Sequence, residues 1–274
     1  MELARLYNLI QNELSNHDRR AATIVMDRYG LESEDYKTLA ELGEVYDLTR
    51  ERVRQIQNST MAAIRSEIGR HKEIVRFLKF VHDYLDSQGG VRPSHLLVKD
   101  FIEANKLKDN EKILNNRLHF IAELVGEPNI VYEDDDWHST WHNNERAYEK
   151  ARAVAKHLNS FDDDNFDRFI ESAGKKFSLP KEKIINYLHI SKNFGIGPYG
   201  DLGAKHWVHI NPKTTKDKNY IVLKYAGKPL HFREIAERVN KLNGVKPSHP
   251  DTVHNELIKD NRFRLVGRGL YALK

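Results

Sequence analysis

The sequence predicts a mainly α-helical chain built from tandem helix-turn-helix and winged-helix domains with small β-ribbon wings. One observation is a pair of apolar helical stripes near the start, followed by a short helix that breaks at Asp47 and Leu48. Another is a five-residue pattern, apolar-x-Asn-x-Leu, that recurs three times about 70 residues apart. Finally, amphipathic helical stretches precede each copy of the pattern and short strand-like segments follow it.

Composition limits the classes of protein that the chain can belong to. Its 274 residues are 39% hydrophobic and 31% charged, which favours several small units over one large core. The chain has no cysteine, so disulfides, thiolate zinc sites and cysteine nucleophiles are excluded. No apolar run approaches the roughly 20 residues of a membrane span, and the first residues lack a signal-peptide core. We therefore expect a protein of the reducing cytoplasm that does not associate with a membrane.

The net charge of +4 is unevenly distributed along the chain. Residues 1–70 carry 10 Lys/Arg and 12 Asp/Glu, and residues 71–220 carry 23 of each. Residues 221–274 carry 11 Lys/Arg and 5 Asp/Glu, a net charge of +6. A basic last segment suits a polyanionic partner, although lysine-rich surfaces also serve solubility.

The first 70 residues are predicted to be helical throughout. Two stripes of apolar residues at helical spacing define the first two helices: Leu3, Leu6, Leu9 and Ile10, then Ala21, Ile24, Val25 and Tyr29. Gly30 ends the second helix. A short helix starts from Thr38 with Leu39 and Leu42 facing inward, and after the break Thr49 supplies an N-cap oxygen for the next helix. This arrangement is a helix-turn-helix.

The rest of the chain is predicted to hold three winged-helix units. The asparagines of the repeated pattern, Asn116, Asn186 and Asn255, lie 70 and 69 residues apart, and Trp137 and Trp207 each follow an asparagine by 21 residues. Helical stretches precede the copies ("EIVRFLKFVHDYL", "AYEKARAVAKHLN", "HFREIAERVNKL"), the last after a strand-like "YIVLKYA". Ribbon-like segments follow them ("NIVYEDDDWHSTW", "GDLGAKHWVHI", "FRLVGRGLYAL"). The predicted domains are 1–70 (helix-turn-helix), 71–145 and 146–218 (winged-helix units), and 219–274 (a winged helix).

The helix that follows Thr49 has two different faces. At 100° per residue, an inward stripe of side chains forms: Val53, Ile56, Thr60 and Ile64. Polar side chains cover the rest of its start, with Arg50 near the N-terminus and Arg52 and Arg54 flanking the outward residues Glu51, Gln55 and Asn58. In the major groove, Arg reads guanine, Gln reads adenine and Glu accepts from cytosine, while the helix N-terminus favours a phosphate. The alternative is an ordinary solvated helix face.

Residues Asp18 to Arg65 resemble region 4 of the sigma factors of bacterial RNA polymerase, with "RYGL", "TLAELG" and "TRERVRQI" in the same order and spacing. The resemblance implies that Arg50, Glu51, Arg54 and Gln55 touch bases or adjacent phosphates of a −35 promoter element. It implies that Thr49 and Arg52 hold the DNA backbone, and that the first helices grip the polymerase β-subunit flap. "QNSTMAAI" replaces the basic residues usual after "RQI". Because only a short helical lead precedes this segment, we do not expect a complete sigma factor.

The segment from Lys228 to Leu273 is similar to the HARE-HTH winged helix, which the delta subunit of RNA polymerase also contains. Pro250 and Asp251 open the second of its helices that could dock, on which Val253, Leu257 and Ile258 are expected to face inward. Gly267 and Gly269 permit the turn between its strands, with a basic wing tip. The expected DNA contacts are Thr252, His254, Asn255, Lys259, Arg262, Arg264 and Arg268. Such modules also bind proteins, and the recurrence of Asn255 in the pattern leaves a structural role open.

Other motifs could suggest a ligand site or a catalytic site, and none has the expected context. "GIGPYG" lacks the strand and helix of a dinucleotide site and is read as a glycine-rich wing. His138 and His142 fall where a strand is expected, which disfavours a metal site. "DDDNFD" lacks the glycine of a calcium loop and is read as a linker or helix start. Neither a hydrolase triad nor a carboxylate–lysine nuclease core is found. We expect no enzyme, cofactor or metal.

Together these features predict a DNA-binding transcription regulator that acts on double-stranded DNA at promoters, with or near RNA polymerase, and that associates with the nucleoid. The alternative is an RNA polymerase accessory protein that occupies the flap and binds DNA with little sequence specificity. The slightly acidic balance of residues 1–70 favours this alternative somewhat.

Overall fold

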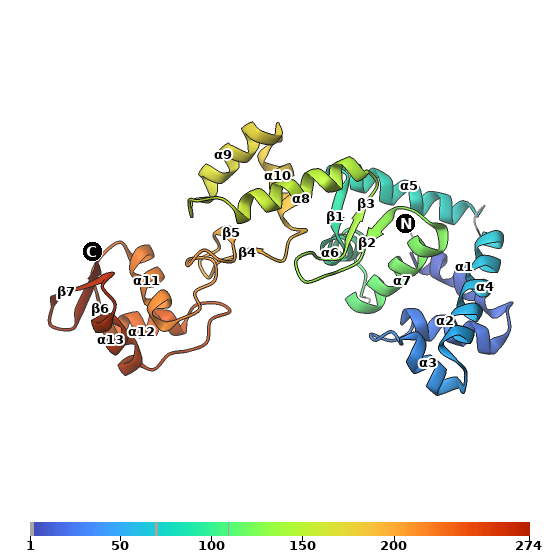
Figure 1. Ribbon diagram of the computed structural model, residues 1–274, viewed down its shortest axis with the longest axis horizontal. Helices are drawn as coiled ribbons and strands as arrows, with labels where there is room; N and C mark the ends of the chain where they lie inside the picture. Colours follow the sequence, from blue (N-terminus) through green and yellow to red (C-terminus); the bar gives the residue numbers. More distant parts are fainter. Residues whose placement is uncertain (1–2, 69–70, 109) are drawn as a thin grey trace. The chain divides into compact units, whose positions relative to one another are not determined.

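The computed structural model describes residues 3–68, 71–108 and 110–274, and side chains from Tyr7 onward. It is mainly helical with small antiparallel sheets, as the sequence predicts (Figure 1). The chain divides into two compact units. The first contains residues up to Arg152 together with Ile185–Ile190, and the second contains Ala153–Ile184 together with Ser191–Lys274. No helix of the described segments is long and apolar enough to cross a bilayer.

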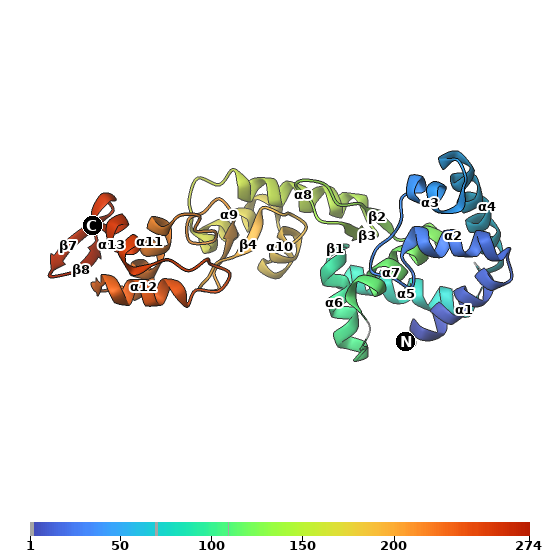
Figure 2. The same cartoon turned by 90° about the horizontal axis from the view of Figure 1, so that it is seen from below.

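The first four helices form the predicted helix-turn-helix. They are α1 (Leu3–Ser15), α2 (Arg19–Tyr29), α3 (Leu39–Tyr46) and α4 (Arg50–Ile68), and Figure 2 shows α2, α3 and α4 lying together. Gly30 ends α2 in the left-handed conformation, with φ of 60°, where a side chain would be strained.

The caps around the turn explain why two helices form instead of one. The Thr38 side chain accepts a hydrogen bond from the Glu41 amide and the Glu41 carboxylate accepts one in return, which starts α3. Asp47 ends α3 with a φ of 52°. The Thr49 hydroxyl then accepts from the Arg52 amide at 3.1 Å, which confirms the predicted N-cap of α4.

The segment after α4 has the element order of a winged helix. Its elements are α5 (Lys72–Ser87), β1 (Val91–Pro93), α6 (Ser94–Asn105), α7 (Glu111–Val125), β2 (Asn129–Val131) and β3 (Thr140–His142). The strands lie in the order β1-β3-β2, with Trp141 opposite both Arg92 and Ile130. One continuous core joins these helices to α1, α2 and α4.

Three helices and a hairpin follow. They are α8 (Glu145–Asn159), α9 (Phe166–Phe177), α10 (Lys181–Leu188), β4 (Phe194–Ile196) and β5 (Leu202–Ala204). The β4–β5 hairpin contains the "GIGPYG" glycines, so the prediction of a ribbon is confirmed. The "DDDNFD" segment is a helix start, because Asn165 caps α9 by accepting from the Arg168 amide.

The last segment repeats the order seen after α4. Its elements are α11 (Thr215–Ala226), β6 (Leu230–His231), α12 (Phe232–Asn240), α13 (Pro250–Lys259), β7 (Phe263–Gly267) and β8 (Leu270–Leu273), with the strands in the order β6-β8-β7. Arg268 and Gly269 make the turn between β7 and β8, and Gly269 has a φ of 69°. The helices and the sheet enclose their own core.

Two expectations about this segment are wrong. "YIVLKYA" belongs to helix α11 and not to a strand, because Thr214 and Asp217 form a capping box upstream and Gly227 ends the helix. Its run of apolar residues reflects a helix buried in the core rather than the alternation of a strand. Ile258 does not face inward: its side chain is 63% exposed, near the end of α13, whereas Val253 and Leu257 are buried as expected.

Candidate nucleic-acid interface

Helix α4 is anchored by the apolar stripe that its sequence predicts. Val53 is fully buried and packs in a small cluster with Ile24 of α2 and Leu42 of α3. Ile56 packs partly against this cluster, and Thr60 and Ile64 are buried further along the helix. The inner side of α4 is therefore fixed on the helices before it, which determines which side chains point away.

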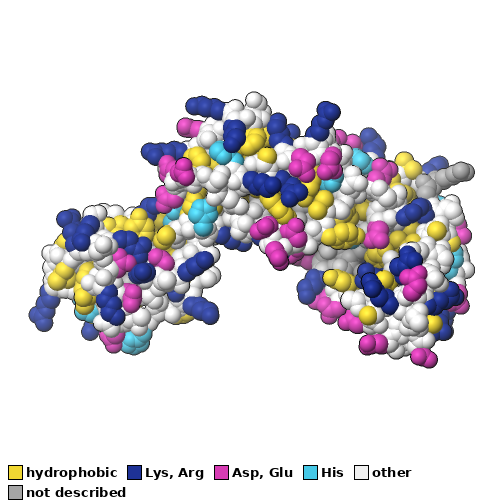
Figure 3. Space-filling model, in the orientation of Figure 1, with side chains coloured by type: hydrophobic (Ala, Val, Ile, Leu, Met, Phe, Trp, Pro, Cys, Tyr) yellow, Lys and Arg dark blue, Asp and Glu magenta, His cyan; other side chains and the backbone are white. Residues whose placement is uncertain are grey.

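The opposite side of the helix start is open. Every residue predicted for this face is exposed in the structure: Thr49, Arg50, Glu51, Arg52, Arg54, Gln55 and Asn58. The seven lie on α4 or at its N-cap, so they form one continuous polar surface. Figure 3 shows Lys and Arg side chains mixed with Asp and Glu over the helix-turn-helix. The candidate interface is this surface.

A hydrogen-bond network orders the exposed side chains before any partner arrives. The Arg54 guanidinium donates to both carboxylate oxygens of Glu51, Nε to Oε2 at 2.8 Å and Nη2 to Oε1 at 2.7 Å. Gln55 donates to the same carboxylate, and Arg52 donates to Gln55. The hydrogen bonds from Arg54 hold the pKa of the Glu51 carboxyl below its usual range. Glu51 thus fixes the direction of Arg54 while occupying two of its donors.

The C-terminal segment presents a second polar surface on α13 and the β7–β8 wing. Thr252, Asn255 and Lys259 of α13 are exposed, as are Arg264 of β7 and Arg268 at the wing tip. Sequence reasoning missed the exposed apolar residues that accompany them: Ile258, Leu265, Val266 and Leu270. In Figure 3 this segment shows Lys and Arg side chains interspersed with hydrophobic ones.

Two of the predicted contact residues in this segment have structural partners. The Arg262 guanidinium forms ion pairs with Asp260 at 2.8 Å and with Asp217 of α11 at 3.2 Å. Arg262 also lowers the pKa of Asp260 by hydrogen bonding. The His254 ring stacks on Phe232, with ring centroids 4.3 Å apart. Of the seven residues predicted here, these two are committed to the fold and the other five face solvent.

The three repeated asparagines have different environments. Asn186 is buried; its amide donates to the carbonyls of Gln88 and Val91 and accepts from Arg92 at 2.7 Å. The Asn116 amide lies at 3.2–3.4 Å from backbone carbonyls of the segment after α2. Asn255 is exposed. The shared pattern therefore marks a similar place on a helix, and not a shared chemical role.

The histidines that were considered as metal ligands pack against other rings. His142 is buried on β3, stacks on Tyr148 at 5.0 Å and lies 3.7 Å from Glu145. The His138 ring contacts His95 edge-on. Among the described residues, no three His, Asp or Glu side chains are grouped so that they could hold a metal ion.

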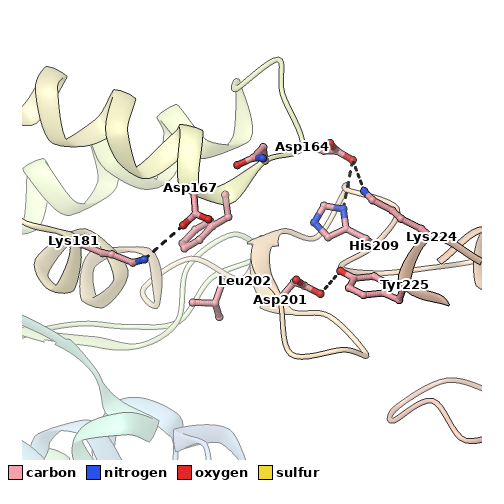
Figure 4. A pocket seen from close by; sticks show the side chains of 10 residues that line it. Asp164, Asp167, Lys181, Asp201, Leu202, His209, Lys224 and Tyr225 are labelled. Atoms are coloured by element: carbon pink, nitrogen blue, oxygen red, sulfur yellow. Dashed lines mark hydrogen bonds and ion pairs between the residues drawn. The ribbon is translucent and has the colours of Figure 1, made fainter. Parts of the chain in front are cut away.

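A polar pocket of about 400 Å³ in the second unit was not found from the sequence (Figure 4). Asp164 lies 3.5 Å from His209 and 3.9 Å from Lys224, and Asp201 accepts a hydrogen bond from Tyr225. Burial lowers the pKa of His209. The carboxylates of this pocket are each paired with a cation or a hydrogen-bond donor, so none of them is placed as a free nucleophile.

The fold and the exposed face of α4 define a helix-turn-helix of the DNA-binding class. Residues 18–66, which span α2, α3 and most of α4, match the family model "Sigma-70, region 4". This part of the chain is therefore a DNA-binding helix-turn-helix of the kind involved in transcription, a family of binding domains rather than of enzymes. The match covers less than half of the chain, and the similarity to HARE-HTH rests on the sequence pattern alone.

Proposed function

We propose that the protein is a DNA-binding transcription regulator that acts at promoters, with or near RNA polymerase, on the bacterial nucleoid. The observation that carries this proposal is the exposed polar face of α4 inside the segment that matches sigma-70 region 4. This face is held in place by the buried stripe and its side chains are ordered by their own hydrogen bonds. Little further conformational entropy would therefore be lost when it binds a partner.

In this proposal the N-terminal half of α4 enters the major groove. Arg54 and Gln55 point outward and carry the donor sets that recognise guanine and adenine edges. Arg50 and Arg52 lie close enough to the helix start to reach phosphates, which the N-terminus of α4 also attracts. Glu51 holds the Arg54 guanidinium against the helix surface through two hydrogen bonds. A guanine edge would have to compete with this pair, which favours sequences that offer Arg54 good acceptors.

The basic C-terminal segment supplies affinity without sequence preference. Its excess of cations and the exposed Lys259, Arg264 and Arg268 suit contacts with phosphates. Two weak modules on one chain gain affinity through effective concentration. Affinity is therefore expected to fall steeply as salt rises.

An RNA polymerase accessory role is the second candidate. It is favoured by the net negative charge of residues 1–70 and by the two donors of Arg54 that Glu51 already occupies. In that case the helix-turn-helix would bind the β-subunit flap, and contact with DNA would be weak and unspecific.

Replacing Arg54 and Gln55 together by Ala separates the two candidates. For the regulator, the double variant should lose at least tenfold in affinity for duplexes enriched by in vitro selection with the full-length protein, and little for random duplex. An Arg76→Ala variant, in which an exposed arginine of α5 is removed, is the matched control. Unchanged DNA affinity together with retained capture of RNA polymerase would support the accessory role instead.

A further inference from the structure

The segments α5–β3 and α11–β8 have the same winged-helix order, but their third helices, α7 and α13, are in different environments. In helix-turn-helix modules the recognition helix reads DNA with its outer face. On α13 of the last segment that face is open, with Thr252, Asn255 and Lys259 exposed. On α7 of the earlier segment, the corresponding surface meets the helix-turn-helix. The contacts of α7 decide what this segment can do.

The loop after α2 lies across the N-terminal part of α7. The Asn116 amide lies 3.2 Å from the carbonyl oxygen of Gly30, and Arg117 Nε donates to the carbonyl of Leu31 at 2.8 Å. These carbonyls belong to the C-cap residue of α2 and the residue after it, and the Leu31 carbonyl also accepts a hydrogen bond from the Tyr7 hydroxyl. Lys112 forms an ion pair with Glu34 at 3.1 Å, one helical turn before Asn116.

Helix α4 in turn binds the C-terminal end of α7. Arg65 Nε donates to the Leu124 carbonyl at 2.6 Å, and its Nη2 donates to the Glu123 carbonyl at 3.1 Å. The last carbonyls of a helix lack donors and carry the negative end of its dipole, so a guanidinium stabilises them by both effects. Tyr29 adds a hydrogen bond to the Glu123 carboxylate at 2.7 Å, and Gln57 of α4 donates to the Tyr29 hydroxyl.

The apolar contacts behind these polar ones are continuous. Ile64 and Ile68 of α4 belong to the same buried cluster as Leu118 and Ile121 of α7. The Tyr29 ring contacts Phe120 edge-on, with centroids 4.9 Å apart. Separating α7 from the helix-turn-helix would expose part of this core to water. The free-energy cost of that exposure disfavours a movement of α7 toward DNA.

We infer that α7 is not a DNA-reading helix but the support that holds the recognition helix α4, with Arg65 as the positioning residue that joins the two. This inference rests on the proposed function, and it assigns the segment 71–145 an internal partner: the helix-turn-helix of the same chain. The reading of bases then falls to α4, and contact through a winged helix falls to α13.

A covalent lock tests whether α7 must leave the helix-turn-helix. The chain has no cysteine, so Glu34→Cys with Lys112→Cys gives one pair that a short bis-maleimide can join where the ion pair stood. Affinity for duplexes selected with the full-length protein should stay within twofold after cross-linking. A tenfold loss relative to the same double variant without cross-linker would overturn the inference. Failure of the unmodified full-length protein to enrich any duplex in the selection would instead count against the proposed function.

Amide hydrogen exchange in the free protein tests the role of Arg65 without DNA. Arg65→Ala should accelerate exchange in the C-terminal turn of α7 and in α4 by at least fivefold. Arg65→Lys, which keeps a cation at the end of α7, should do so less, and Arg76→Ala should leave both helices unchanged. Exchange in α4 that is the same in Arg65→Ala as in the unmodified protein would show that this side chain does not position the helix, whatever the protein binds.

Discussion

At the scale of single residues, Glu51 is the one acidic side chain among the predicted contacts on the candidate interface. A carboxylate on a face that meets phosphates is repelled by them, yet here it accepts two hydrogen bonds from Arg54 and one from Gln55. Glu51 therefore lowers the expected affinity for DNA but fixes the orientation of Arg54. In the proposed function, the side chains that would read DNA are held in one direction by a carboxylate that itself weakens the attraction to phosphates.

This trade predicts the outcome of Glu51→Gln. The amide keeps the length of the side chain but removes the negative charge, so affinity for random-sequence duplex should rise about threefold to tenfold. Discrimination between selected and random duplex should fall, because Arg54 loses its fixed direction. Fluorescence anisotropy with both duplexes measures the two effects. Glu44→Gln, which removes an exposed carboxylate from α3, is the control, and equal gains in both variants would mean that charge alone is responsible.

Residue-level sequence reasoning succeeded where neighbours along one helix set the environment. The helical wheel of α4 placed Val53 inside and Gln55 outside, because a period of 3.6 residues needs no knowledge of distant segments. It failed to find the second partner of Arg262, because Asp217 comes from α11, 45 residues earlier in the chain. The exposure of Ile258 was missed for a similar reason: only the packed structure shows where the helix leaves the core.

At the scale of elements, helix caps and turns determined the secondary structure more than residue propensity did. Residues 220–226 contain β-branched and aromatic side chains that favour a strand, and the structure makes them helical. The signals for a helix were present in the Thr214–Asp217 box and in Gly227, but a buried helix and a buried strand have similar apolar runs. Short elements such as β6 were beyond sequence reasoning, since they exist through pairing with β8.

The repeated asparagines give an element-level prediction. Asn186→Ala removes the donor for two buried carbonyls and the acceptor for Arg92, so the free energy of unfolding should fall by about 2 kcal/mol. Asn255→Ala, at the same place in the pattern but exposed, should change it by less than about 0.5 kcal/mol. Urea unfolding followed by tryptophan fluorescence measures both. Equal effects would mean that the pattern marks one common structural role after all.

At the scale of the whole molecule, two partly buried histidines link stability to pH. Desolvation lowers the pKa of His119 to about 4, and desolvation with the nearby cationic Arg92 does the same for His189. In the unfolded chain both pKa values return to about 6.5. Their contribution to stability is therefore complete above pH 6.5 and is lost as the pH falls toward 4, because the unfolded state binds protons first.

Urea unfolding at pH 7.5 and pH 5 should show this loss. The midpoint for the first unit should fall at pH 5, and His119→Gln should reduce the difference between the two pH values, since the neutral amide does not titrate. His206→Gln, which replaces an exposed histidine, serves as the control. A pH dependence that is the same in the His119→Gln variant as in the unmodified protein would place the titrating groups elsewhere.

The proposed division of work between α4, which would read DNA, and the basic C-terminal segment predicts a dependence on DNA length. If both modules hold the same duplex, Arg264→Ala with Arg268→Ala should weaken binding to a long duplex, through loss of about two phosphate contacts and a salt slope that is shallower by about 2. A duplex truncated to the footprint of α4 should show no such effect, because the C-terminal module then has no DNA to reach. Titrations of both duplexes at several salt concentrations separate the two cases. A loss of equal size on long and truncated DNA would mean that these arginines act on the α4 site itself, and no change on either would leave the C-terminal module without a part in DNA binding.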